Sequence, residues 1–481
     1  MSKPNKSQEI AYKIPEEWAF FKSEEICEKV QSGSTPRNNP FTATGDIPFL
    51  KVYNIVGQKI NFKYKPQFIS REIQESAISR SKVIENDVLM NIVGPPLGKI
   101  AIVTSEYPEW NINQAITLFR ANPDFLDYRF LFYFLNEGSA IRSIHGDLKG
   151  SVGQVNISLT QCRNFMVPTP PLAEQKVIAD KLDELLAHVE STKARLDSIP
   201  AILKSFRQSV LAAAVSGKLT EEWRGENGVA LSSWKTVKVG DFVQAIEAGK
   251  SLKCIETPPS QNEFGIIKIS AVTWGVYDES ESKTLPSNDL FIENRRVKVG
   301  DLLISRANTM ELLGNPVIVH RVTKNLMLSD KVLRLVMEEA NKPWVSIFLR
   351  SKAGRKEIES RSTGNQMSMR NIGQKALLDI GLPKATESEQ TEIVRRVEEL
   401  FAFANKVEAQ VNAAQTRVNN LTQSILAKAF RGELTADWRT ANPELISGDN
   451  SAKALLERIK AEREALALAA KKKPRAKKAK V

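Results

Sequence analysis

The residues of this chain that can carry catalysis are few and scattered. Asp124, Asp147 and Lys149 form the one grouping that resembles a nuclease site, in which two carboxylates and a lysine hold Mg²⁺ and activate water. However, Asp147 lies in a Gly-rich stretch rather than on a strand that would fix it, and the second half of the chain has no counterpart. We therefore predict no catalytic centre and no metal site, and metal-dependent nuclease activity is kept only as a minor alternative.

Motifs that bind phosphate or a cofactor are also missing from the sequence. The GKS tripeptide at 249–251 lacks the glycine that a P-loop needs five residues before its second glycine, where Gln244 stands, and no G-x-G-x-x-G occurs. The Pro-Pro strings at 94–97, 169–172 and 257–260 lack the Asn or Asp and the aromatic residue with which a base-amino methyltransferase holds a flipped base. We predict that the chain is not an enzyme and carries no cofactor.

Composition limits the class of protein further. The three cysteines are far apart, which argues against a disulfide framework or a zinc site, and the polar N-terminus does not resemble a signal peptide. No apolar run approaches the 18 or so residues that span a bilayer, so we expect a cytoplasmic protein without membrane contact. The net charge is +12, and the tail 471–481 carries seven Lys or Arg and no acid. Such a tail either contacts nucleic acid non-specifically or only solubilises the end of the chain.

The elements that must position any functional residue are revealed by an ungapped internal repeat. Residues 173–224 match residues 388–439, which lie 215 positions later. Glu174-Gln175 falls on Glu389-Gln390, and the closing SGKLTEEWR falls on RGELTADWR. This period is far longer than the roughly 20–50 residues of a solenoid repeat. The chain therefore consists of two similar halves.

Both copies of the repeat predict a long helix with an apolar seam. Apolar residues follow one another at spacings that alternate between three and four, which is the period of a left-handed coiled coil. A helix from about 173 to 215 would be roughly 65 Å long. The seam residues are Ile178, Leu182, Leu185, Val189, Leu196, Leu203, Phe206, Val210, Ile393, Val397, Leu400, Val407, Val411, Val418, Leu421 and Ile425. Each apolar stripe needs a partner, and the other copy is the nearest one. Two ordinary core helices remain the alternative, and Pro200 predicts a kink or restart in the first helix only.

The globular parts of the two halves share a pattern of short strands and one buried helix. Runs such as 47–52, 87–93 and 114–120 predict strands, and 125–136 predicts a helix. The second half repeats this order with little identity: Trp18 pairs with Trp234, Gly33 pairs with Gly249, and a Gly-rich loop is expected at 146–158 and again at 361–373. The two halves therefore share a scaffold and differ in their loops.

We predict an α+β protein in which two α/β domains are separated by two long helices that pair as an antiparallel coiled coil with pseudo-two-fold symmetry. The expected segments are a lead (1–14), domain 1 (15–170), a central helical spacer (171–224), domain 2 (231–383), a C-terminal helical spacer (384–439), a linker with a packing helix (440–470) and a basic disordered tail (471–481). Two-fold proteins read DNA half-sites about one turn, roughly 34 Å, or more apart. Because the net charge favours DNA, the pattern predicts a two-headed DNA binder on a rigid spacer.

The repeated motifs resemble a known family. LAEQKVIADKLDELLAHVESTKAR with SGKLTEEWR, repeated as SEQTEIVRRVEELF with RGELTADWR, is similar to the specificity subunits of Type I restriction–modification systems. The segments VNNLTQSILAKAFRGELTADWR and SGDNSAKALLERIKAERE resemble the enterobacterial branch of that family in particular. The resemblance covers the whole chain. One departure is KATESEQ, which lacks the Pro-Pro-Leu that precedes the first Glu-Gln.

This resemblance implies a function for each part. Each domain would be a target-recognition domain that reads one half of a bipartite, asymmetric sequence in double-stranded DNA. The helices would set the spacer and dock two modification subunits, which carry S-adenosylmethionine and methylate adenine at N6. Two restriction subunits would add ATP- and Mg²⁺-dependent cleavage for defence against phage. The chain itself would be non-catalytic.

Family motifs do not identify the residues that contact DNA. We expect them in loops where glycine allows close approach and where basic, hydroxyl or amide side chains reach phosphates and base edges. The candidates are Ser34, Thr35, Arg37, Lys99, Lys149, Ser151 and Gln154 in domain 1, and Lys250, Ser251, Lys253, Ser305, Arg306, Asn308, Arg361, Asn365, Gln366 and Arg370 in domain 2. The remaining alternative is a coiled-coil adaptor that binds protein partners without reading DNA, although its loops would be less basic.

Overall fold

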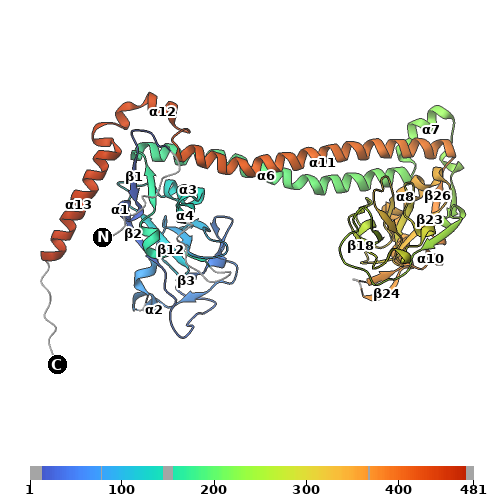
Figure 1. Cartoon of the computed structure of the whole chain (residues 1–481). Coiled ribbons are helices and arrows are strands. Elements are labelled where there is room, and N and C mark those ends of the chain that lie inside the picture. The colour runs from blue at the N-terminus through green and yellow to red at the C-terminus, as the bar shows by residue number, and fades with distance from the viewer. Residues whose placement is uncertain (1–12, 77, 145–154, 367–368, 473–481) are drawn as a thin grey trace. The chain divides into compact units, whose positions relative to one another are not determined.

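The computed structural model describes residues 13–76, 78–144, 155–366 and 369–472. The chain divides into two compact units: unit 1 holds residues 1–195 and 415–481, and unit 2 holds residues 196–414. Both divisions fall inside the two long helices, α6 (Leu172–Val215) and α11 (Glu387–Phe430) (Figure 1). Each unit therefore combines one globular domain with the first part of one helix and the last part of the other.

Domain 1 is built around two sheets of four strands. The first sheet is antiparallel throughout and orders β10 (Ile100–Ile102), β8 (Val88–Asn91), β12 (Ile116–Ala121) and β2 (Cys27–Ser32). The second orders β6 (Phe68–Ile69), β3 (Ile47–Leu50), β11 (Trp110–Ile112) and β7 (Lys82–Val83), with β3 and β11 parallel. Two-stranded pairings join β1 (Ala19–Lys22) to β14 (Met166–Thr169), β9 (Val93–Gly94) to β13 (Val155–Asn156), and β4 (Ile55–Val56) to β5 (Lys59–Ile60).

The first sheet of domain 1 is buried on both faces because successive side chains of a strand point to opposite sides. Phe119 belongs to the core that also contains α3 (Tyr128–Glu137), whereas its neighbour Leu118 belongs to the core around Trp110. Helix α3 begins at Asp127, whose side chain accepts hydrogen bonds from two backbone amides, and ends at Gly138 in the left-handed conformation. Shorter helices are α1 (Ser23–Ile26), α2 (Arg71–Ser76), α4 (Ser139–Arg142) and α5 (Leu159–Arg163).

Domain 2 repeats the same order of strands. Its antiparallel sheet orders β21 (Pro316–Ile318), β19 (Leu302–Ser305), β23 (Val332–Val336) and β16 (Ala245–Ala248), and its mixed sheet orders β18 (Ser282–Thr284), β17 (Phe264–Ile267) and β22 (Asn325–Met327). β15 (Lys235–Lys238) pairs with β26 (Gly381–Lys384), and a further sheet orders β20 (Ala307–Asn308), β25 (Met369–Asn371) and β24 (Thr363–Gln366). Its helices are α8 (Lys342–Arg350), α9 (Lys352–Arg361) and α10 (Gln374–Leu378).

The predicted pairing of Gly33 with Gly249 has a steric cause that is common to both domains. A Cβ atom on Gly33 would lie 2.0 Å from the carbonyl oxygen of Asn113, and one on Gly249 would lie 1.6 Å from the carbonyl oxygen of Leu328. In each domain the chain leaves its first long strand by crossing directly over another backbone segment. Only glycine fits at such a crossing.

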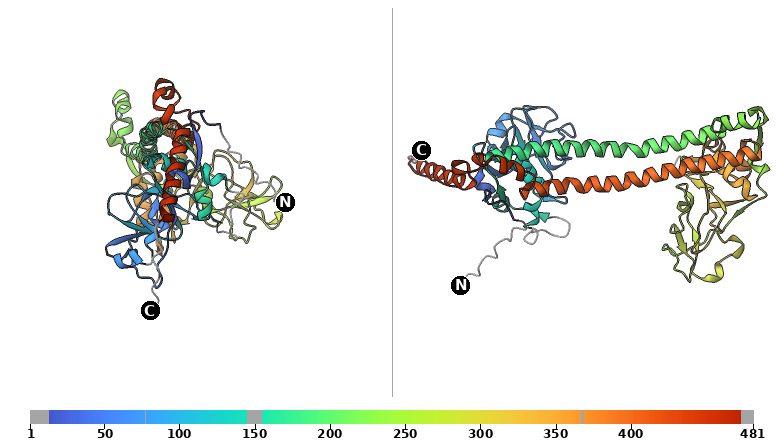
Figure 2. Two further views of the ribbon diagram at one scale, coloured as in Figure 1. Left: turned by 90° about the vertical axis from the view of Figure 1, so that its left-hand side faces the viewer. Right: turned by 90° about the horizontal axis from the view of Figure 1, so that it is seen from above.

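The two long helices pack against each other in each unit, antiparallel as predicted (Figure 2). In unit 1, Ile178 and Leu182 near the start of α6 share a core with Leu426 and Phe430 near the end of α11. Unit 2 exchanges these roles, because the start of α11 and the end of α6 share a core through residues such as Val397 and Val210. The prediction of an α+β fold with paired antiparallel helices is confirmed.

Most of the seam residues are buried or half-buried. Ile178, Leu182, Val189, Leu203, Val210, Ile393, Val397 and Val411 are buried, and Leu185, Leu196, Phe206, Leu400, Val407, Val418 and Ile425 are half-buried. Leu421 is a wrong assignment, because its side chain is 45% exposed. A strict 3.5-residue ladder drifts around a helix of 3.6 residues per turn, so that Leu426 is buried near the end of α11 instead.

The predicted restart at Pro200 does not occur, because α6 is one continuous helix from Leu172 to Val215. Proline removes a single backbone donor from the helix. Pro200 is exposed, whereas Leu203 on the following turn is buried, so packing on the next turn holds the helix together.

A short helix follows each long one. α7 (Glu221–Asn227) follows α6, and α12 (Ala436–Ala441) follows α11. The expected terminal helix is α13 (Ala452–Lys472), which packs into the core of unit 1 through Ala452, Leu455 and Ile459. Among the described helices, none is both long and apolar enough to cross a membrane.

Candidate nucleic-acid interface

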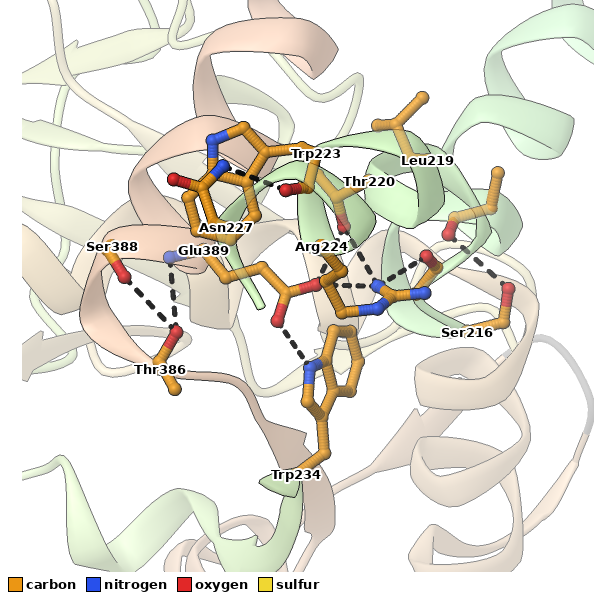
Figure 3. Close-up of polar contacts among 12 residues, drawn as sticks. Ser216, Leu219, Thr220, Trp223, Arg224, Asn227, Trp234, Thr386, Ser388 and Glu389 are labelled. Atoms are coloured by element: carbon orange, nitrogen blue, oxygen red, sulfur yellow. Dashed lines mark hydrogen bonds and ion pairs between the residues drawn. The ribbon is translucent and has the colours of Figure 1, made fainter. Parts of the chain in front are cut away.

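The repeated motif builds a buried polar cluster in unit 2 around Glu389, here called the Glu389 clamp (Figure 3). Glu389 is fully buried near the start of α11. One carboxylate oxygen accepts hydrogen bonds from the Thr220 hydroxyl at 2.8 Å and from Arg224 Nη1 at 2.6 Å. The other accepts from the Trp234 indole N–H at 2.7 Å. The clamp thus ties the motif that follows α6 to the start of α11 and to the first strand of domain 2.

Unit 1 contains the same cluster with the helices exchanged, here called the Glu174 clamp. Glu174 near the start of α6 is fully buried. Its oxygens accept hydrogen bonds from the Thr435 hydroxyl and Arg439 Nη1, each at 2.6 Å, and from the Trp18 indole N–H at 3.0 Å. The motif that follows α11 is therefore tied to the start of α6 and to the first strand of domain 1.

Each clamp satisfies the buried charges that it contains. Arg224 also donates to the carbonyl of Gly217 at 2.7 Å, and Arg439 donates to the carbonyl of Gly432 at 2.6 Å. A buried carboxylate and guanidinium are stable only when they are paired and fully hydrogen-bonded. Sequence reasoning missed this role, although one signal was available: an acid at the start and an arginine at the end of each repeat copy.

The glutamine after each clamp glutamate fixes the entry of the chain into the helix. Gln175 Nε2 donates to the carbonyl of Pro170 at 2.9 Å, and Gln390 Nε2 donates to the carbonyl of Ala385 at 2.8 Å. Because β14 and β26 directly precede these entries, each domain is held at the start of one helix by a clamp and by a glutamine. The clamp contacts are the same in both units, whereas Gln175 also donates to the carbonyl of Phe125 at 3.0 Å and accepts from the amide of Asp127 at 2.9 Å.

The candidate contact residues of domain 1 lie in separate loops. Ser34, Thr35 and Arg37 follow β2, where Thr35 donates to Gln114 and Arg37 is exposed. Lys99 is half-exposed beside β10, in a turn that shares a shallow hollow with Val56 and other residues of the loop after β3. The other three candidates, Lys149, Ser151 and Gln154, lie outside the described residues.

Domain 2 brings several candidates together on one small sheet. Asn308 in β20 pairs directly with Arg370 in β25, and β24 on the other side of β25 carries Asn365 and Gln366. Arg306 immediately precedes β20. The loop predicted at 361–373 is thus wrong, since most of it forms a hairpin. Its Gly, Ser and Asn content resembles a loop, but Gly364 supplies a bulge with φ +123° that lets the two strands pair.

The side chains of this sheet differ in how far they are free to bind a ligand. Arg370 donates to the carbonyl and the hydroxyl of Ser362, each at 2.8 Å, and so holds its own hairpin. Arg361 is ion-paired with Glu357 at 2.6 Å. Arg306 is half-exposed and has no hydrogen-bond or ion-pair partner for its side chain among the described residues. Arg306 is therefore the arginine of this group most available for a phosphate or a guanine edge.

Ser305 is not available as a contact residue. It is fully buried, and its hydroxyl donates to the carbonyl of Leu312 at 3.2 Å and accepts from the amide of Gly314 at 3.2 Å. The assignment of Ser305 to the interface is wrong, because a hydroxyl next to a strand end can as readily close the following turn. Lys250, Ser251 and Lys253, in contrast, are exposed beyond the crossing at Gly249.

The side chain of Arg355 stabilises the turn between β20 and β21. Its guanidinium donates to the carbonyl of Leu313 and, at 3.1 Å, to the carbonyl of Met310. Burial lowers the pKa of Arg355, yet its donors are occupied by main-chain acceptors. The turn that follows Asn308 is consequently well fixed.

A metal centre is not found in the described part of the chain. It contains no group of three or more His, Cys, Asp or Glu side chains that could hold an ion. Asp124 is exposed there, whereas its proposed companions Asp147 and Lys149 lie outside the described residues.

Fold and site together define a class of protein: a binding protein with two related domains, each held on paired helices by an identical clamp and each presenting different polar loops. Comparison with known proteins identifies the class further. A family model described as Type I restriction modification DNA specificity domain matches residues 15–201. The specificity subunit of Type I restriction enzyme EcoKI from Escherichia coli K12 is 34% identical over 95% of this chain and 97% of its own length. The EcoBI specificity subunit from Escherichia coli is 38% identical over 74% of this chain and 76% of its own.

Solved structures agree in fold. The HsdS subunit from Thermoanaerobacter tengcongensis covers 88% of this chain and 99% of its own with a TM-score of 0.57 and 20% identity. A chain from a structure on complex assembly and conformational transition of the type I R-M system gives a TM-score of 0.66 at 19% identity, with 88% and 100% covered. This chain belongs to the family of Type I restriction enzyme specificity subunits. The resemblance inferred from the repeated motifs is confirmed, and specificity subunits are the non-catalytic recognition components of their complexes.

Proposed function

We propose that this chain selects the DNA target of a Type I restriction–modification complex, with each domain reading one half of a bipartite, asymmetric sequence. The observation that carries this proposal is the contrast between equal clamps and unequal loops. Glu174 and Glu389 make the same three kinds of contact, whereas the strand pair β20–β25 of domain 2 places Asn308 opposite Arg370 and the corresponding pair β9–β13 of domain 1 places Gly94 opposite Val155. Two equal holders with two unlike faces suit two half-sites of different sequence.

For the half-site of domain 2, we assign base reading to Arg306 and to the N–H and the oxygen lone pair of the Asn308 amide that its bonds with Thr273 and Thr309 leave unused. An arginine donates bidentately to guanine, and an asparagine pairs with adenine in the major groove. The exposed Lys250 and Lys253 are placed to contact phosphates, which fix register without reading sequence. In domain 1 we assign the corresponding contacts to Arg37 and Lys99.

The paired helices serve as the spacer and as the docking surface for two modification subunits. Two copies of one partner need two equal surfaces, and the repeat is ungapped where the helices lie. The methyl donor S-adenosylmethionine would be held by the modification subunits, and ATP with Mg²⁺ by two restriction subunits. In this arrangement the present chain works in the cytoplasm and contributes binding alone.

An adenine-methylation map of a host that expresses this chain with its modification partner tests the proposal. The expected result is a new bipartite motif, methylated on both strands, with a fixed number of unspecified base pairs between its halves. A host that shows no new methylated motif, although the complex assembles, would instead support an adaptor that does not read DNA.

A further inference from the structure

An exposed aromatic side chain marks a surface of domain 2 that the sequence did not point to. Trp274 is 73% exposed, and Val276, two residues later, is 72% exposed. Gly275 between them adopts φ +80°, a turn conformation that glycine allows without strain. Large apolar side chains that are exposed close together in a chain can mark a binding surface.

This loop is anchored to the candidate DNA-reading sheet. Asn308 Nδ2 donates to the Thr273 hydroxyl at 3.2 Å, and Asn315 Nδ2 donates to the Thr273 carbonyl at 2.9 Å. The Thr273 hydroxyl in turn donates to the carbonyl of Ile269 at 2.9 Å. Trp274 therefore follows directly on a residue that is hydrogen-bonded to Asn308 of β20.

An arginine without an acceptor lies on the other side of the loop. A Cβ atom on Gly275 would be 3.4 Å from Arg350 Nη2, and the guanidinium of Arg350 lies over the Phe401 ring at 5.5 Å. No hydrogen-bond or ion-pair partner for this guanidinium is found among the described residues. Burial, followed by the nearby Arg207, lowers the pKa of Arg350, although an arginine remains charged at neutral pH. A half-buried cation with unused N–H donors is well suited to receive an anion.

In domain 1, the loop that corresponds to the Trp274–Val276 loop is held by hydrogen bonds within the domain. Gln58 there follows Gly57, which also has a positive φ, and its side chain donates to Asn136 Oδ1 at 2.8 Å and accepts from the amide of Ile100 at 2.6 Å. Asn136 near the end of α3 takes the place of Arg350 at the end of α8. Domain 2 replaces this bonded amide pair with an exposed valine and an arginine that lacks an acceptor.

We propose that Trp274 and Arg350 form a further DNA-contact surface of domain 2, in which Arg350 donates to a backbone phosphate and Trp274 packs against the adjoining sugar or base. This inference rests on the proposed function, since it assumes that domain 2 binds duplex DNA. A phosphate supplies the acceptor that Arg350 lacks, and the apolar tip covers the neighbouring deoxyribose. The contact extends the footprint of domain 2 beyond β20 and gives the two half-sites different backbone contacts.

Titrating the assembled complex with a labelled duplex of the methylated motif at several salt concentrations tests this inference. Removing one phosphate contact lowers the slope of log affinity against log salt by about 0.9, so Arg350→Ala is expected to reduce both affinity and slope. Trp274→Ala is expected to weaken binding about tenfold without changing the slope, because the contact is apolar and of the kind that dominates interfaces. The matched controls Lys298→Ala and Val299→Ala remove an exposed cation and an exposed apolar side chain elsewhere in domain 2 and are expected to change neither.

The conservative variants Arg350→Lys and Trp274→Tyr, which keep charge and aromatic surface, are expected to restore most of the affinity, and this rescue excludes misfolding as the cause of a loss. Wild-type affinity and slope in both alanine variants would overturn the inference while leaving the proposed function intact. A loss confined to assembly with the modification subunit would overturn it as well and would assign the surface to that partner. If the wild-type complex fails to distinguish the methylated motif from a scrambled duplex, both the proposed function and this inference are wrong.

Discussion

The two clamps of this molecule are closely similar to each other, whereas the loops of its two domains differ. The Glu174 and Glu389 clamps use the same four residue types, and corresponding hydrogen bonds differ in length by at most 0.3 Å. The loops of the two domains differ in their partners, since Gln58 is hydrogen-bonded within domain 1 whereas Val276 is exposed in domain 2. The contacts are equal where the chain holds its own parts together, and they differ in the loops to which we assign ligand binding.

This contrast shows how one chain can present two unlike faces on one scaffold. Each clamp joins the end of one repeat copy to the start of the other, so that neither unit is complete without residues from both halves of the sequence. A substitution in a clamp should therefore destabilise one unit. A substitution in a loop should leave stability unchanged and alter only what is bound.

The largest effect is expected from removing a clamp glutamate. Glu389→Ala leaves Arg224 buried without its carboxylate, and Glu174→Ala does the same to Arg439. Loss of one partner of a buried pair typically costs about 3–5 kcal/mol. Urea unfolding of each variant measures this cost, and we expect the two values to agree within about 1 kcal/mol.

The matched control for the clamps is Glu408→Ala. Glu408 pairs with Arg207 at 2.6 Å but is 45% exposed, so its removal should cost no more than about 1 kcal/mol. Clamp variants that cost as little as this control, or two clamp variants with very different costs, would contradict the equality of the two units.

A smaller and again equal effect is expected at the clamp tryptophans. Trp18→Phe and Trp234→Phe keep most of the ring but delete the indole N–H that donates to the glutamate. A hydrogen bond to a charged group contributes about 1.5–3 kcal/mol. Differential scanning calorimetry should show a similar decrease in stability for both variants. A decrease for only one of them would show that the remaining donors compensate in the other unit.

The loops of domain 2 should respond in binding and not in stability. Arg306→Ala is expected to lower discrimination between cognate and scrambled duplex by about 1–3 kcal/mol, the usual contribution of a bidentate base contact. Its unfolding midpoint should stay at the wild-type value, because no side-chain partner is lost among the described residues. Competition binding by the assembled complex measures the first quantity.

Arg370→Ala tests the same distinction between effects on binding and effects on stability. Arg370 already donates hydrogen bonds to Ser362 within its own hairpin. We expect it to lower the midpoint of unfolding of domain 2 and to weaken binding to cognate and scrambled duplex alike. A selective loss of cognate binding with unchanged stability would instead assign Arg370 to base reading.

The smallest effect is expected where the two repeat copies differ at the helix surface. Glu392 is flanked by Arg395 and Arg396, whose hydrogen bonds lower the pKa of Glu392 to about 2, whereas the first copy has Val177 at this place. The folded pKa lies below the unfolded value of about 4.3, so this contribution is present above pH 4.3 and is lost as the pH falls toward 2. Glu392→Gln should cost less than about 1 kcal/mol at pH 7 and flatten the acid limb of urea unfolding. An unchanged acid limb would contradict it.

The sequence predicted the scaffold well because its signals are local and repeated. Apolar residues with a period of 3.5 over some 40 residues leave few alternatives to a long helix, and the ungapped repeat predicts two such helices of equal length that pair with each other. The pairing of Glu174 with Arg439 was not predicted, although antiparallel helices bring the end of one copy to the start of the other, because charged residues usually lie in solvent and only their burial shows that they are paired. Leu421 was misassigned, and the restart that was allowed for at Pro200 does not occur, because neighbouring turns, rather than the residue itself, decide burial and continuity.

The candidate site was predicted in kind but not in detail. Residue types indicated where polar loops lie, and domain 2 does pair Asn308 with Arg370 on one sheet, with Arg306 immediately before it. Type alone did not reveal that Ser305 and Arg370 satisfy their own backbone, since each donor has several acceptors within reach. Trp274 was overlooked because an isolated tryptophan in sequence resembles a core residue, and only its exposure reveals it.

The central claim, that each domain reads its own half-site, is tested most directly by the adenine-methylation map of a host that expresses the Arg306→Ala, Asn308→Ala double variant with its modification partner. The account predicts that one half of the bipartite motif becomes degenerate while the other half and the spacing stay as in the wild type. Equal loss of sequence preference in both halves, or a motif identical to that of the wild type, would contradict it.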